Sequence, residues 1–145
     1  MYTRAIGFNG DVDAAMLPAH IADGLRRMDA RAVEVNENHV SFTGGIFRLV
    51  GNWNVLVPFG FGDLTVDSDA HHIRYRVSFR QLVIGTTVIV GIMGGFIWYE
   101  SRSWQGLLFI AVGWMWIVGG NCALGISRFE SFLRRVIATA PRLKR

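Results

Sequence analysis

The sequence predicts an α+β membrane protein. We expect a small N-terminal domain of one helix plus an antiparallel meander sheet, a two-helix transmembrane hairpin, and a C-terminal basic amphipathic helix. Two observations carry this prediction: two long uncharged segments lie in the second half of the chain, and short β-branched and aromatic runs separated by turn residues fill the first half. The composition agrees, because 51% of the 145 residues are hydrophobic and 18% are charged, against about 25% charged in a typical soluble domain.

The two uncharged segments have the length of membrane spans, and we place the spans at 81–99 and 105–126. The first would cover roughly 28 Å as a helix, which is close to the hydrocarbon thickness of a bilayer. Aromatic side chains that favour the headgroup level cluster at the junction, namely Trp98, Tyr99 and Trp104. Two buried helices of a soluble protein are excluded, because the rest of the chain is too short to cover them.

Positive charge orients the hairpin. Nine lysines and arginines flank the spans on the side of the chain termini, whereas the connecting turn contains only Arg102. Because positive residues resist translocation, both termini are expected in the cytoplasm. The N-terminal segment lacks the apolar stretch of a signal peptide. We therefore expect an integral protein of the bacterial inner membrane with residues 1–80 as a cytoplasmic domain.

Turn residues divide this N-terminal domain into short strands. We expect strands at 32–35, 39–43, 46–50, 54–59, 63–66 and 72–79. Ahead of them, apolar residues recur at helical spacing, namely Leu17, Ile21, Leu25 and Met28. This pattern predicts one amphipathic helix packed on one face of the sheet.

The last expected strand alternates strictly and continues into the first span. Its apolar residues, Tyr75 among them, should face the core, while its arginines face outward near the membrane surface. We expect lipid headgroup contacts from this strand and from the C-terminal segment, at Arg74, Arg76, Arg80, Arg128, Arg134 and Arg135. The alternative is that these residues only orient the spans and form a solvated surface.

The C-terminal segment, 127–145, is expected to form a separate helix. Ser127 and Glu130 have the spacing of a capping box, and apolar residues from Phe129 onward share one helical face. Such a helix could lie in the membrane interface or cover the cytoplasmic sheet. A straight continuation of the second span is a third possibility.

Small residues in the spans predict close helix packing. Gly91 and Gly95 form a GxxxG pair in the first span, and Gly119 and Ala123 form a similar pair in the second. Asn121 could add a hydrogen bond between helices. These residues could join two copies of the chain in a homo-oligomer, or they could pack the hairpin's own helices.

No motif indicates catalysis. His71 and His72 are adjacent on a strand and should point to opposite faces, and no histidine, cysteine and carboxylate cluster has metal-ligand spacing. A GxSxG nucleophile motif is absent, and the glycine pairs are turns. We therefore expect no enzyme activity, no metal and no cofactor, and no nucleic-acid partner.

The layout of a small cytoplasmic sheet domain fused to a two-span hairpin is similar to that of bacterial membrane proteins with pleckstrin-homology-like modules. The resemblance is one of architecture and rests on no residue motif. The first functional hypothesis is a non-enzymatic membrane protein whose cytoplasmic sheet binds lipid headgroups or a cytoplasmic protein, as a homo-oligomer. The alternative is an oligomeric pore, whose polar lining would be limited to Asn121, Thr86 and Thr87.

Overall fold

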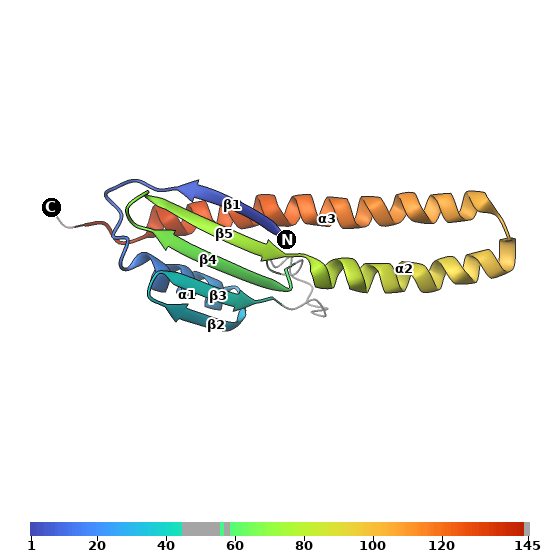
Figure 1. The fold of residues 1–145 in the computed structure, drawn as a ribbon, viewed down its shortest axis with the longest axis horizontal. Helices are drawn as coiled ribbons and strands as arrows, with labels where there is room; N and C mark the ends of the chain where they lie inside the picture. The colour runs from blue at the N-terminus through green and yellow to red at the C-terminus, as the bar shows by residue number, and fades with distance from the viewer. Residues whose placement is uncertain (45–55, 57–58, 144–145) are drawn as a thin grey trace.

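The chain forms a sheet region from which a long helical hairpin extends (Figure 1). The computed structural model describes every residue except 45–55, 57–58 and 144–145. The elements follow the order β1 (Tyr2–Gly7), α1 (Leu17–Arg27), β2 (Arg31–Asn36), β3 (His39–Thr43), β4 (Phe61–Asp67), β5 (His72–Ser78), α2 (Arg80–Ser101) and α3 (Trp104–Thr139). The predicted α+β class, with an antiparallel sheet and two long apolar helices, is confirmed.

The sheet has five antiparallel strands in the order β1-β5-β4-β3-β2. The strands predicted at 32–35, 39–43, 63–66 and 72–79 correspond to β2, β3, β4 and β5, which form the expected meander. The strand predicted at 46–50 lies outside the described residues. Of the range 54–59 only Leu56 and Phe59 are described, and both are buried.

β1 is a strand that the sequence pattern did not predict. It pairs with β5 at the edge of the sheet and places Tyr2, Arg4 and Ile6 opposite the buried residues of β5. The apolar alternation of β1 is interrupted because Arg4 occupies a position on the inward side. Its guanidinium is matched there by a carboxylate of α3, a residue that the local sequence cannot reveal.

One face of the sheet is covered by α1 and by the end of α3, which also contact each other. Phe129 of α3 lies at the centre of this core, with its ring centroid 5.2 to 5.8 Å from those of Phe42, Phe59 and Tyr75. Gly24 weakens α1 intrinsically but allows the two helices to approach. A Cβ at this position would lie only 3.1 Å from the ring of Phe132.

α3 is one continuous helix of 36 residues, so the predicted separate C-terminal helix is wrong. Its N-cap is Ser103, whereas Ser127 lies within the helix and its carbonyl accepts a hydrogen bond from the Ser131 hydroxyl at 2.9 Å. The Glu130 carboxylate does not cap a helix and binds residues of the sheet instead. The third possibility, a straight continuation of the second span, is the observed one, and its last turns cover the sheet.

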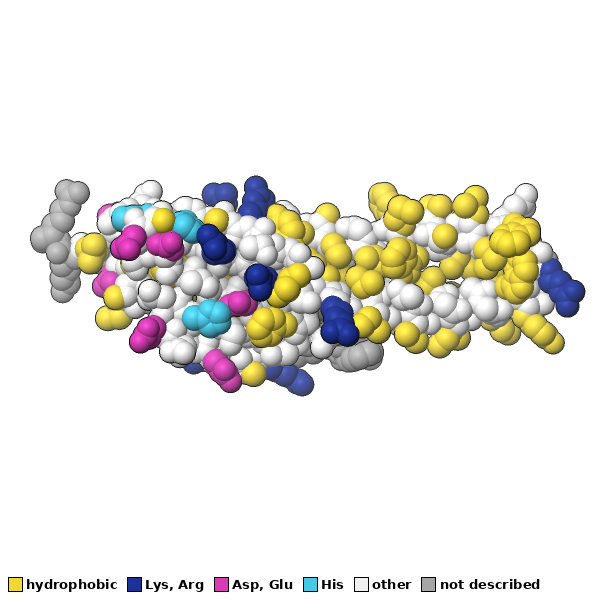
Figure 2. All heavy atoms as spheres, viewed as in Figure 1, with side chains coloured by type: hydrophobic (Ala, Val, Ile, Leu, Met, Phe, Trp, Pro, Cys, Tyr) yellow, Lys and Arg dark blue, Asp and Glu magenta, His cyan; other side chains and the backbone are white. Residues whose placement is uncertain are grey.

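α2 and α3 form an antiparallel hairpin that contains the predicted spans. Arg102 adopts a left-handed conformation at the turn, and its N–H donates to the Trp98 carbonyl. Both helices are long and apolar enough to cross a membrane, and only 6% of each apolar window is buried. Figure 2 shows hydrophobic side chains over the hairpin, whereas acidic and histidine side chains gather over the sheet region. Most of the hairpin surface is therefore apolar and uncovered.

Replacement of Phe129 by alanine should lower the free energy of unfolding by about 3–5 kcal/mol, because it leaves a cavity beneath three aromatic neighbours. The matched control is Phe109→Ala on the same helix, where the ring is 81% exposed. Chemical unfolding in mild detergent, followed by tryptophan fluorescence, measures both. An equal decrease in the free energy of unfolding in the two variants would contradict the assigned core.

Candidate functional site

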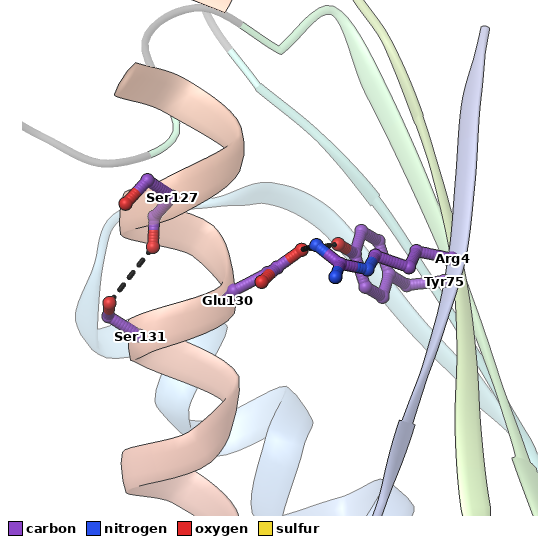
Figure 3. Close-up of polar contacts among 5 residues, drawn as sticks. All are labelled: Arg4, Tyr75, Ser127, Glu130 and Ser131. Carbon is purple, nitrogen blue, oxygen red and sulfur yellow. Dashed lines mark hydrogen bonds and ion pairs between the residues drawn. The ribbon is translucent and has the colours of Figure 1, made fainter. Parts of the chain in front are cut away.

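A polar cluster joins α3 to the covered face of the sheet (Figure 3). The Oε1 atom of Glu130 accepts a hydrogen bond from the Tyr75 hydroxyl at 2.8 Å and an ion-paired hydrogen bond from Nη1 of Arg4 at 2.6 Å. The three side chains come from α3, β5 and β1. One carboxylate oxygen thus links the edge strand, its neighbour and the helix.

Burial and charge act together on this cluster. Tyr75 is fully buried, which raises the pKa of its phenol, and the hydrogen bond to the Glu130 carboxylate raises it further. The same carboxylate raises the pKa of the Arg4 guanidinium. The phenol therefore stays protonated and the guanidinium charged. Because each of the three side chains has a partner here, the cluster acts as a fixed connection between α3 and the sheet.

The opposite face of the sheet is uncovered by any described helix and is polar. The register places Thr3, Arg76, Asp63, Ser41 and Glu34 in one row across the five strands. Two histidines of this face lie near carboxylates. Nε2 of His39 is 3.0 Å from Oδ1 of Asp63, and Nε2 of His72 is 3.9 Å from Oδ2 of Asp67. In Figure 2, cationic, anionic and histidine side chains are mixed over this region.

A shallow recess of about 240 Å³ lies on this uncovered face. Its lining comes from β1, β4 and β5, at Thr3, Asp63, Thr65, Arg74, Tyr75 and Arg76. The recess forms because the side chain of Tyr75 points to the covered face, so that only backbone separates the two outward arginines. No group of three or more histidine, cysteine, aspartate or glutamate side chains among the described residues could hold a metal ion.

The six arginines predicted to contact lipid headgroups are spread along three elements, β5, α2 and α3. Arg80 is the first residue of α2, whereas Arg74 lies six residues earlier on β5, which corresponds to about 20 Å of strand. On α3, Arg128 precedes Arg135 by seven residues, or about 10 Å of helix, and Arg134 is adjacent to the latter. Arg80 therefore lies at the start of the apolar hairpin, with Arg76 between it and Arg74, and Arg128 lies two residues after the second predicted span.

Space is open around the predicted packing residues of the spans. A Cβ added at Gly91, Gly95 or Gly119 would meet nothing within 4 Å, and Ala123 is exposed. Nδ2 of Asn121 donates to the Ile117 carbonyl of its own helix at 2.7 Å.

Other residues hold the two helices together. Nε1 of Trp114 donates to the Thr87 hydroxyl at 3.0 Å, so Thr87 joins α2 to α3. A Cβ at Gly94 would lie 3.7 Å from the Ile110 side chain.

Sequence reasoning missed the cluster of Arg4, Tyr75 and Glu130. One signal was available, because a tyrosine at a core position requires a hydrogen-bond partner for its hydroxyl. The identity of that partner depends on how α3 returns to the sheet, which local patterns do not specify. Comparison with protein-family models, with curated proteins and with solved structures found no match to this chain.

Tyr75→Phe should change how stability depends on pH. Since the folded state raises the pKa of this phenol, the unfolded chain releases its proton first, near pH 10. The stability contributed by the protonated phenol is therefore complete below about pH 10 and is lost as the pH rises above it. Unfolding of the wild type should weaken steeply there, and the variant should lack this component.

Denaturant titrations between about pH 9 and 11 measure the effect. Tyr99→Phe, at the exposed tip of the hairpin, is the matched control and should retain the full decline. An identical pH dependence in the wild type and in Tyr75→Phe would show that the phenol is not held protonated by the fold.

Proposed function

We propose that this chain is a non-enzymatic integral membrane protein whose cytoplasmic sheet domain is a binding or scaffold module held against the membrane surface. The observation that carries the proposal is the continuity of α3. One helix extends from the tip of the apolar hairpin to the covered face of the sheet, with no flexible linker. β5 also leads directly into α2, with Phe79 alone between them.

Two connections without linkers would fix the sheet relative to the bilayer. Once the hairpin spans the membrane, the uncovered polar face of the sheet would stand close to the membrane surface and remain open to a partner. Membrane lipids are the first partner, with Arg80 nearest to the headgroups. A cytoplasmic protein is the second, since the strands carry a mixed polar surface that extends away from the hairpin.

An oligomeric pore is the alternative, and the polar contacts of the hairpin argue against it. The Thr87 hydroxyl is occupied by Trp114, and Asn121 binds its own helix. Of the three polar side chains available for a lining, two therefore already have partners within the chain.

Homo-oligomerisation remains part of the proposal. A shallow apolar groove of about 620 Å³ runs between α2 and α3, and both Gly91 and Gly95 line it. Because added Cβ atoms there would meet nothing, the groove can accept an apolar helix from a second copy without a clash.

Cysteine labelling in intact cells tests the topology, after Cys122 has been replaced by serine. A cysteine at Glu100, exposed at the hairpin tip, should react with a membrane-impermeant maleimide. A cysteine at Ser68, exposed in the turn between β4 and β5, should react only after permeabilisation. The reverse pattern would place the sheet outside the cytoplasm and overturn the proposal.

Gly95→Leu should shift the protein towards the monomer, because the larger side chain fills the groove. Phe96→Leu, at an exposed neighbouring position, keeps a large apolar residue there and should leave the assembly unchanged. Native mass spectrometry from mild detergent measures both. A monomeric wild type would contradict the oligomer, and these glycines would then belong to the hairpin alone.

A further inference from the structure

The recess on the uncovered face of the sheet has two guanidinium groups at positions i and i+2 of β5. Arg74 and Arg76 are both exposed, and neither forms an ion pair within 4.0 Å with any residue that the structure describes. Between them the floor is the backbone at Tyr75. Two cations thus flank a hollow whose one acidic lining residue, Asp63, forms no ion pair with either of them.

The acidic residues nearest to these arginines have other close partners as well. Asp63 is directly opposite Arg76 in the register, yet its Oδ1 atom is buried and lies 3.0 Å from Nε2 of His39, on the far side from Arg76. Asp67 accepts a hydrogen bond from the Ala70 N–H at 3.0 Å, which is the largest cause lowering the pKa of its carboxyl, and the charge of Arg74 lowers this pKa further without an ion pair. The charge of the two arginines is therefore only partly compensated within the sheet.

The walls of the recess add uncharged donors. Thr3 on β1 and Thr65 on β4 line it from opposite sides of β5. Ala5, opposite Arg74 on β1, is small and leaves this side open. Hydroxyl groups on two walls and guanidinium groups on either side of the floor can donate hydrogen bonds to one anion from several directions.

We propose that this recess binds a phosphate group. A guanidinium presents paired N–H donors that match the oxygens of a phosphate, and a tetrahedral anion can accept from donors on three strands at once. A planar carboxylate has only two oxygens and would leave some of these donors unused. The phosphate can belong to a soluble phosphorylated molecule or to a lipid headgroup, and the second source rests on the proposed membrane location.

Inorganic phosphate is the probe for the first arm of the test. The full-length protein is placed in nanodiscs of phosphatidylcholine, and the side-chain Nε–H signals of its arginines are followed by NMR during titration. The signals of Arg74 and Arg76 should shift and saturate with phosphate and should not do so with chloride at equal ionic strength. Shifts that do not saturate, or that chloride reproduces, would overturn the proposal.

Arg76→Gln should weaken phosphate binding about tenfold or more, because it removes charged hydrogen bonds to the anion. Arg27→Gln, an exposed position on α1 with the same change in net charge, is the matched control and should change affinity less than about twofold. Equal weakening in both variants would show non-specific attraction and would refute a site.

Asp63→Asn distinguishes an effect of charge on phosphate binding from an effect of a disrupted recess. Loss of the negative charge at the recess wall should tighten phosphate binding, whereas disruption of the recess would weaken it. Weakening as large as that of Arg76→Gln would contradict the assigned geometry.

The second arm replaces part of the phosphatidylcholine by phosphatidic acid, without free phosphate. Shifts of Arg74 and Arg76 in these nanodiscs assign the phosphate to a lipid headgroup, whereas shifts with inorganic phosphate alone assign it to a soluble molecule. If neither probe produces saturable shifts, the phosphate site is refuted. The labelling of Glu100→Cys and Ser68→Cys does not depend on this result. The proposed membrane topology is therefore tested independently of the phosphate site.

Discussion

The packing of the last turns of α3 against the covered face of the sheet is the constraint on which the rest of the structure depends. Phe129 contacts aromatic rings from β3, from β5 and from the segment before β4. Without α3, the buried side chains of these strands would lose their cover, because α1 contacts mainly β2 and β3. A meander of this size has a small core and depends on the cover of its apolar face for stability. The helix that completes the core is also one of the two apolar helices of the hairpin.

The continuity of α3 couples the two ends of the molecule geometrically. Trp114 faces α2 in the hairpin, and Phe129 faces the sheet fifteen residues later. At about 100° per residue these positions differ by about 60° around the helix axis. An unbroken helix keeps this angle, so the hairpin contact and the sheet contact cannot rotate independently. The Glu130 cluster adds a directional contact beside Phe129, since its hydrogen bonds require one rotation and one height of the helix relative to β5 and β1.

The two faces of the sheet have different physical roles. Among the described residues the covered face is mostly apolar, and the buried hydroxyl of Tyr75 has a partner in Glu130, as burial demands. The uncovered face has charged side chains in several rows, and Arg74 and Arg76 there have no ion-pair partner among the described residues. Stability therefore resides on one face, which leaves the other free to vary in chemistry. This separation is what makes the uncovered face the place to search for a ligand.

The sequence by itself determined the elements whose periodicity is local. Helix α1, strands β2 to β5 and the two apolar helices follow from apolar spacing and turn residues, because these patterns depend on neighbours within a few positions. Even the inward orientation of Tyr75 could be predicted from its place in an alternating strand. The edge strand β1 was hidden because Arg4 breaks its alternation.

Only the tertiary structure decided that the segment after Ile126 continues α3 and packs on the sheet. Ser127 and Glu130 match a capping box in spacing, but a continuing helix satisfies the hydrogen bonds of the backbone equally well. The apolar face from Phe129 onward is stabilised by contact with a sheet that is distant in the sequence. Likewise, Glu130 acquires its role from residues 126 and 55 positions away in the chain. Sequence patterns report local periodicity, whereas the return of a helix to a sheet depends on long-range contacts. The recess between Arg74 and Arg76 required the register of three strands, and so it too became visible only in the fold.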